Sequence, residues 1–233
     1  MGYSRKDEIA RIRQERREAK ASKKRKENVR EAIVRFLIVC EGTKTEPLYF
    51  QSLIDNNFSS VREVKIEGEG KATVKLVDET LEIKKRLECN NAMSFDRVWI
   101  VFDKDDFDDF NEAIKKAKQL GFQCAWTNES FELWYCLHFE YLNTGISRSD
   151  YIRKLEDTFK FKTGDSSFKY KKGNPENYKL LKKHGDENLA KRFAEKLRKC
   201  YTDHDYATHN PCTMVDRLVD ELEHPEELLA HKQ

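Results

Sequence analysis

Two apolar runs that each end at an acidic residue constrain the fold of this chain more than any other feature. The runs cover residues 33–40 and 98–102 and are rich in β-branched and aromatic side chains. Short runs of this kind are typical of strands buried on both faces of a parallel sheet. Apolar residues at helical spacing lie between the runs. We therefore expect an α/β fold with a mostly parallel sheet flanked by helices.

Weaker patterns extend this prediction along the chain. Residues 61–67 alternate between apolar and polar side chains, and residues 122–126 form a shorter apolar run, so both are predicted strands. Pro47 is predicted at the first position of the helix that follows the first run. Gly121 is predicted to end a later helix, because glycine adopts the left-handed conformation at low cost. The predicted helices between the strands begin near residues 47, 74, 109 and 131.

The strand patterns stop near residue 146, and only helical patterns follow. We therefore predict an α/β core over residues 31–145 and a helical C-terminal extension over residues 146–233. The helical patterns of the extension cover about 148–160, 176–183, 186–200 and 213–223.

Residues 1–30 form a basic arm that we expect to be helical or disordered. The arm holds twelve Lys and Arg residues against five Asp and Glu residues, a net charge of +7. The whole chain carries +2, so the other 203 residues carry −5. An arm of this kind can lie along the phosphates of a nucleic acid. The alternative is a solvated segment without a partner.

Composition excludes several classes of protein. Hydrophobic residues make up 38% and charged residues 37%, with nine Gly and four Pro, which excludes collagen-like, membrane-spanning and Pro/Gly-rich disordered chains. The six cysteines are scattered without a C-x-x-C pair, and the first residues lack the apolar segment of a secretory signal. We therefore expect a cytoplasmic protein without disulfides and without a membrane partner.

Acidic residues follow both apolar runs directly. Glu41 follows the first run, and Asp103 and Asp105 follow the second. Because the carboxyl ends of parallel strands meet at one edge of a sheet, we expect these three carboxylates to converge there. Crowded carboxylates repel unless a cation lies between them, and Mg²⁺ prefers such oxygen ligands. The alternative is that acids at strand ends only form turns or cap the next helix.

Two of these segments together resemble the Toprim domain. Residues 39–42 and 101–105 match its pattern of a Glu after the first strand and an Asp-x-Asp after a later one. Four ordered segments within about residues 36–222 resemble the RloB-like family more closely than the Toprim domain in general. One difference from the family pattern is Glu129, where a proline is expected after Asn128. The four segments cover residues 36–47, 98–105, 131–139 and 210–215.

The resemblance implies a Toprim-like fold and a metal-dependent nuclease. Its substrate is RNA, transfer RNA included, or DNA, and its setting is bacterial anti-phage defence by abortive infection, often beside an ATPase partner. The alternative is a non-catalytic subunit that binds nucleic acid or a partner protein. Strand passage or primer synthesis is a third reading, for which 233 residues leave little room. A homo-oligomer is open, although no heptad pattern supports one.

The resemblance also assigns roles to individual residues. Glu41, Asp103 and Asp105 are predicted to bind one Mg²⁺ (or Mn²⁺), and Glu46 and Glu132 to complete a second metal site. For Glu132 the alternative is a buried acid satisfied by backbone amides at a helix start.

Lysines are the predicted contacts of a nucleic acid. Lys44 and Lys104 lie beside the predicted metal ligands and are expected to meet a phosphate or to point to solvent. Lysines in the extension alternate with aromatic residues, as in surfaces that bind single strands. Ordinary amphipathic helices are the equal alternative. The lysines of the extension that we select are Lys171, Lys172, Lys182 and Lys183.

Histidines and cysteines support no other chemistry. Four of them lie between residues 200 and 212, but their spacing fits no common zinc module. His138 lies in an apolar segment and is predicted to be a packed core histidine. The Asn-Pro-x-Thr turn at residues 210–213 is predicted to begin the last helix.

Overall fold

The structure is a computed structural model that describes residues 14–18, 33–56, 62–68, 73–91, 94–104 and 108–230. The chain forms two compact units, Met1–Ile33 and Val34–Gln233. In the first unit residues 14–18 are helical, and the rest of the predicted basic arm lies outside the described residues. The predicted boundary near residue 145 stays a prediction. No helix in the described ranges is long and apolar enough to cross a membrane.

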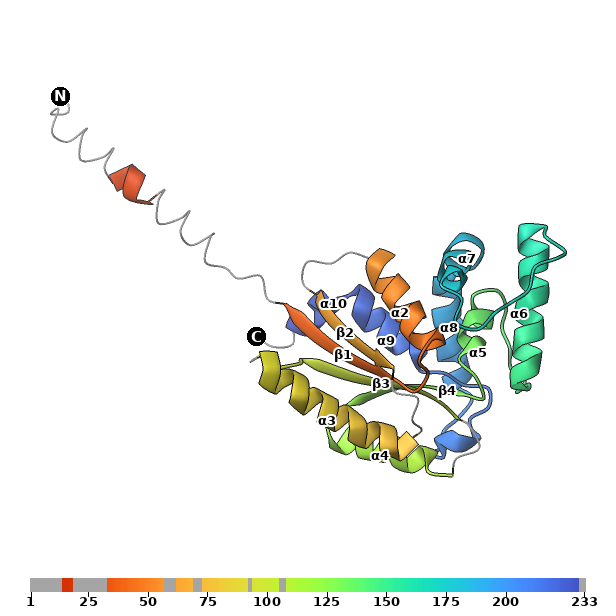
Figure 1. Cartoon of the computed structure of the whole chain (residues 1–233), viewed down its shortest axis with the longest axis horizontal. Coiled ribbons are helices and arrows are strands. Elements are labelled where there is room, and N and C mark those ends of the chain that lie inside the picture. The colour runs from red at the N-terminus through yellow and green to blue at the C-terminus, as the bar shows by residue number, and fades with distance from the viewer. Residues whose placement is uncertain are drawn as a thin grey trace, which may run out of the picture. The chain divides into compact units, whose positions relative to one another are not determined.

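Four parallel strands form the sheet of the second unit (Figure 1). The parallel strands confirm the predicted α/β class. Because the strands are parallel, their carboxyl ends lie at one edge, which is where ligands bind in sheets of this kind. In spatial order the strands are β2 (Arg62–Gly68), β1 (Val34–Cys40), β3 (Arg97–Lys104) and β4 (Gln123–Asn128).

Helices cover both faces of the sheet, so its central strands are buried on both sides. Leu37 and Val39 of β1 pack in one apolar cluster, and the even-numbered residues of this strand pack in the other. This alternation follows from the period of two in a strand. Two helices, α3 (Thr73–Asn91) and α4 (Phe110–Gln119), cover the face of Leu37 and Val39 (Figure 1). Gly121 after α4 has φ +75°, which confirms its predicted left-handed conformation.

The opposite face is covered by α2 (Thr45–Asn56), α5 (Glu132–Leu137) and the C-terminal helices. An aromatic cluster joins α2 to α5. Trp134 donates a hydrogen bond from Nε1 to the hydroxyl of Tyr49 at 2.8 Å, and Phe131 packs edge-on against the same ring at 5.6 Å. These buried contacts fix the first turn of α2 relative to the start of α5, and both turns contribute to the site described below.

The helices predicted after residue 146 are confirmed, and a short last helix is added. Arg198 at the end of α8 binds both carboxylate oxygens of Asp216 in α9, at 2.5 and 2.7 Å, and thereby joins these two helices. The C-terminal elements are α6 (Arg148–Thr163), α7 (Glu176–His184), α8 (Glu187–Arg198), the 3₁₀ turn η1 (Tyr206–Thr208), α9 (Val215–Glu223) and α10 (Pro225–Ala230).

The start of α2 differs from the prediction. Pro47 is the third residue of this helix, which begins at Thr45, and the carbonyl of Lys44 accepts the first hydrogen bond from Leu48 at 2.9 Å. Proline is tolerated there because the first N–H groups of a helix have no partner within it. Glu46 is therefore part of the first helical turn.

Candidate active site

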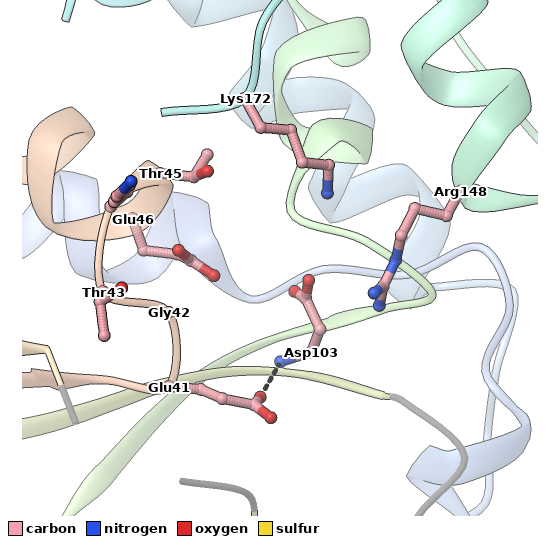
Figure 2. A pocket seen from close by; sticks show the side chains of 9 residues that line it. Glu41, Gly42, Thr43, Thr45, Glu46, Asp103, Arg148 and Lys172 are labelled. Carbon is pink, nitrogen blue, oxygen red and sulfur yellow. Dashed lines mark hydrogen bonds between the residues drawn. The ribbon is translucent and has the colours of Figure 1, made fainter. Parts of the chain in front are cut away.

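A pocket lies at the carboxyl ends of β1 and β3 (Figure 2). Its volume is about 320 Å³, and three acidic side chains line it, those of Glu41, Glu46 and Asp103. Cys40 of β1 lies beside Val101 of β3 in the parallel register, which brings Glu41 next to the end of β3. We call this cavity the acidic pocket. Its other lining residues are Gly42, Thr43, Lys44, Thr45, Arg148 and Lys172.

Hydrogen bonds from backbone N–H groups hold the carboxylates of Glu41 and Asp103. The carboxylate of Glu41 accepts a hydrogen bond from the N–H of Asp103 at 3.1 Å, as Figure 2 shows. The carboxylate of Asp103 accepts one from the N–H of Phe131, just before α5, at 3.0 Å. Glu41 and Asp103 are thus fixed beside each other.

The acidic pocket is electrostatically costly without a cation. Burial raises the pKa of Asp103 well above its ordinary value, and the negative charges of Glu46 and Glu132 raise it further. Burial also raises the pKa of Glu46, and Glu132 adds to the shift. Arg148 and Lys172 act in the opposite direction on Glu46. A further cation in the pocket would therefore be favoured.

Glu132 lies behind the pocket, not on its lining. It is fully buried, and its carboxylate accepts hydrogen bonds from the hydroxyls of Ser130 and Tyr170, the latter at 3.1 Å. Lys172, in the segment before α7, reaches the same carboxylate at 2.9 Å. Glu132 therefore holds Lys172 at the rim of the acidic pocket. Its predicted part in a second metal site stays a prediction.

One comparison with known proteins identifies the family of this chain. The model of the RloB-like protein family matches residues 36–222, which is most of the chain. The chain belongs to the RloB-like protein family. No curated protein and no solved structure was found to match it.

Arg148 is a residue of the site in this RloB-like protein that sequence reasoning missed. It is the first residue of α6 and lies beside Asp103 in Figure 2. Its guanidinium donates to the carbonyl oxygen of Glu129 at 2.9 Å, and its N–H donates to the carboxylate of the same residue at 3.3 Å. No periodicity or motif marks Arg148, because it reaches the pocket only through the packing of α6.

Glu129 has a conformation that its place in the sequence does not suggest. Its φ is +68°, in the left-handed region. Proline, which the family pattern favours here, cannot adopt a positive φ because its ring fixes φ near −65°. At residue 129 this RloB-like chain therefore forms a turn that a proline could not form. In this turn both the carbonyl and the carboxylate of Glu129 contact Arg148.

The lysines predicted to contact a nucleic acid lie in different parts of the structure. Lys44 and Lys172 line the acidic pocket, and Lys104 lines a second cavity beside it. The other three, Lys171, Lys182 and Lys183, are exposed. Two of the aromatic residues that alternate with the lysines of the extension, Tyr170 and Tyr178, are buried in the core.

His138 and His209 are both buried and held by contacts within the protein. His138 is buried with its Nδ1 at 2.9 Å from the carbonyl oxygen of Trp134, and burial lowers its pKa to about 4. This confirms the predicted core histidine. His209 contacts the carboxylate of Asp203 at 2.9 Å and stacks on the ring of Tyr201. These contacts do not resemble a zinc site.

The acidic pocket has the donor chemistry of a magnesium site. Carboxylate oxygens alone suit Mg²⁺ or Mn²⁺, and not the nitrogen and sulfur ligands that zinc favours. Asp105 lies outside the described residues. Within the described part of the chain, no three His, Cys, Asp or Glu side chains form a group that could hold a metal as they stand. A metal at the acidic pocket would therefore need more than the present arrangement of these side chains.

Proposed function

We propose that the acidic pocket cleaves phosphodiester bonds of RNA or DNA with Mg²⁺ or Mn²⁺. The observation that carries this proposal is the pairing of Glu41 and Asp103. They come from the ends of adjacent parallel strands, they are joined by a hydrogen bond, and both line one pocket. The raised pKa of Asp103 supports it further, because perturbed carboxyls in clefts are frequent at active sites.

The residues of the acidic pocket would have two roles, metal binding and phosphate binding. Glu41 and Asp103, with Asp105, would hold the metal, and Glu46 would complete the ligands from the opposite side of the pocket. The bound ion would polarise the phosphate and lower the pKa of a water molecule. Arg148 and Lys172 would bind phosphate oxygens and stabilise the negative charge that develops during cleavage.

Glu46 has a second role in this proposal. Burial raises its pKa from the ordinary value of 4.5. A carboxylate whose pKa is closer to neutral is a better proton acceptor at physiological pH. When it does not bind the ion, Glu46 is therefore suited to take the proton from an attacking water.

The family resemblance alone supports the proposed setting. We propose a cytoplasmic enzyme of bacterial anti-phage defence that works beside an ATPase partner. One observation favours the alternative of a non-catalytic binding subunit: among the described residues the acids form no ready metal group, and Arg148 and Lys172 already lower the pKa of Glu46.

The test is a cleavage assay with matched acid variants. We expect the full chain to cut at least one of plasmid DNA, single-stranded DNA and total cellular RNA in Mg²⁺ or Mn²⁺, and to stop in chelator. Glu41→Gln should abolish cleavage without loss of folding. Glu67→Gln is the control, since Glu67 lies near the end of β2 and pairs with Lys65. An inert wild type, even with its ATPase partner present, would favour the binding subunit.

Gly42 provides a milder test of the role of Glu46. A Cβ atom at Gly42 would overlap the carboxylate of Glu46, lying 2.7 Å from its Cδ, so Gly42→Ala must push this carboxylate away. We expect cleavage to fall about tenfold or more, because small displacements of catalytic groups are costly. The melting temperature should change little, since the displaced group is the end of a flexible side chain. Gln51→Ala, at an exposed position of α2 outside the pocket lining, should cleave like the wild type. Full activity of Gly42→Ala would exclude a role for Glu46.

A further inference from the structure

A second cavity adjoins the acidic pocket. Its volume is about 490 Å³, and Arg148 lines both cavities. Lys104, which follows Asp103 in β3, lines the second cavity. Both volumes lie within the range of ligand pockets, roughly 300–1,000 Å³. The other lining residues are Asn128, Glu129, Ala207, Thr208 and Asn210.

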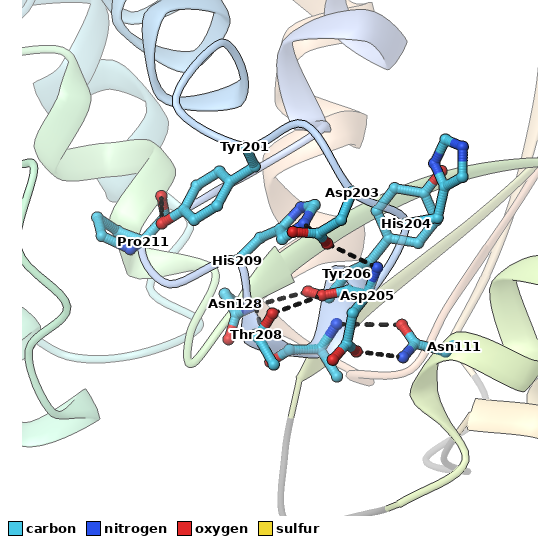
Figure 3. Close-up of polar contacts among 11 residues, drawn as sticks. Asn111, Asn128, Tyr201, Asp203, His204, Asp205, Tyr206, Thr208, His209 and Pro211 are labelled. Carbon is cyan, nitrogen blue, oxygen red and sulfur yellow. Dashed lines mark hydrogen bonds and ion pairs between the residues drawn. The ribbon is translucent and has the colours of Figure 1, made fainter.

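The wall of this cavity is fixed by contacts that the proposed cleavage site does not use. The side chain of Asn111 in α4 donates to the carboxylate of Asp205 at 2.6 Å and accepts from the N–H of Ala207 at 3.1 Å (Figure 3). His209 stacks on Tyr201 with ring centroids 4.3 Å apart and planes 11° apart. The segment that carries η1 is therefore held in place before any ligand binds.

Asn128 presents a side-chain amide to the cavity. This residue is 3% exposed, and its Nδ2 donates to the carbonyl of Tyr206 at 3.1 Å and to that of Ala207 at 3.5 Å (Figure 3). Its carbonyl oxygen is on the other side of the amide group and can accept a hydrogen bond from a ligand in the cavity.

Glu129 is the acidic residue on the lining. Its carboxylate accepts the N–H of Arg148 at the start of α6, at 3.3 Å. Lys104 and Arg148 supply positive charge, Asn128 and Asn210 supply amide groups, and Ala207 is the single hydrophobic residue among the lining side chains. This chemistry matches a phosphate and a sugar. It does not match a stacked base, which needs an aromatic ring.

We infer that the second cavity holds the sugar and phosphate of the nucleotide next to the bond that is cut. This inference rests on the proposed function, because it takes the acidic pocket as the place of cleavage. Lys104 and Arg148 bind the phosphate, and the carbonyl oxygen of Asn128 accepts a hydrogen bond from the 2′-hydroxyl of an RNA sugar or from an N–H group of the adjacent base. A single strand then passes from one cavity to the other across Arg148.

Binding without cleavage tests the inference. The full chain is titrated in chelator against a fluorescein-labelled single-stranded decamer, made as RNA and as DNA, and the anisotropy is recorded at several salt concentrations. Lys104→Ala should raise Kd about tenfold and reduce the salt slope by roughly 0.7, the value for one phosphate contact on a single strand. Asn210→Ala, at an exposed position of the lining, should raise Kd about threefold.

Lys162→Ala is the matched control. Lys162 is exposed near the end of α6, 14 residues after Arg148, and is therefore about 21 Å away along the helix. Its replacement should change Kd less than twofold. The decamer that binds more tightly, and whose affinity falls in the two test variants, identifies the sugar. If Lys104→Ala and Asn210→Ala bind both decamers like the wild type, the inference is wrong even if the enzyme cleaves. If they bind more weakly but no condition gives cleavage, the proposed function is wrong and the binding site stands.

Discussion

Replacing Asp103 with asparagine should lower cleavage by about 1,000-fold or more and leave the fold as stable as the wild type, or more stable, at neutral pH. The amide oxygen can still accept the hydrogen bond that Phe131 donates to Asp103. What the variant loses is the negative charge that the proposed metal needs. A loss of this size corresponds to about 4 kcal/mol of transition-state stabilisation, which is the scale of metal-ion catalysis.

The expected gain in stability follows from the direction of the pKa shift. The folded state raises the pKa of Asp103 above its ordinary value of 3.8, chiefly by burial, so the folded protein holds this proton more tightly than the unfolded chain does. The resulting stability is present below pH 3.8 and is lost as the pH rises through the folded pKa. The neutral amide of the variant does not titrate and carries no such loss. The difference in unfolding free energy between Asp103→Asn and wild type should therefore grow in favour of the variant above about pH 4.

Urea unfolding at pH 4, 6 and 8, without added metal, measures this difference. Glu67→Gln is again the control, because Glu67 lies outside the acidic pocket and should show no such trend. A variant that is less stable than wild type by the same amount at every pH would contradict the argument, since Asp103 would then act only through its hydrogen bond. Cleavage at the wild-type rate would contradict the proposed role in metal binding.

The sequence predicted the sheet and the position of the first two carboxylates because both depend on local pattern and simple topology. Continuous apolar runs identify β1 and β3 as central strands. Once the strands are parallel and adjacent, Glu41 and Asp103 must lie at the same edge. The family resemblance added Glu46, which the structure also places at this pocket.

The remaining features of the two cavities depend on tertiary packing that no local pattern encodes. Arg148 lies 45 residues after Asp103 and comes from a different helix, and Lys172 comes from an irregular segment. The side-chain amide of Asn128 takes its place in the second cavity only because η1 packs against the end of β4. Charge and periodicity along the chain cannot distinguish these residues from the many other polar residues on the surface.

Lys172→Met should destabilise the fold by about 3 kcal/mol. Lys172 pairs with the carboxylate of Glu132, whose side chain is 1% exposed. Breaking a buried pair by removing one partner costs roughly 3–5 kcal/mol, because a charge is left buried without compensation. We expect the lower end of this range, since the side chain of Lys172 is itself 40% exposed. The free energy of unfolding in urea at pH 8 measures the effect.

Glu132→Gln distinguishes the lost charge from lost packing. The glutamine amide retains an acceptor for the hydroxyl of Tyr170, and Lys172 can turn toward solvent, so this variant should lose only about 1 kcal/mol. The double variant Glu132→Gln with Lys172→Met should then be more stable than Lys172→Met alone by about 2 kcal/mol, because no buried charge is left. Additive losses in the double variant would exclude the ion pair as the cause.

Cleavage by the same three variants determines the role of Glu132. If Glu132 only positions Lys172, Glu132→Gln should lower cleavage no more than Lys172→Met does, and the double variant should resemble either single variant. If Glu132 is instead a metal ligand, Glu132→Gln should be as inactive as Asp103→Asn and should need a higher concentration of Mn²⁺ for half-maximal activity. The three donors to its carboxylate, from Ser130, Tyr170 and Lys172, favour the first result. With these donors in place, a metal would have to displace Lys172 from a carboxylate that the fold has already buried.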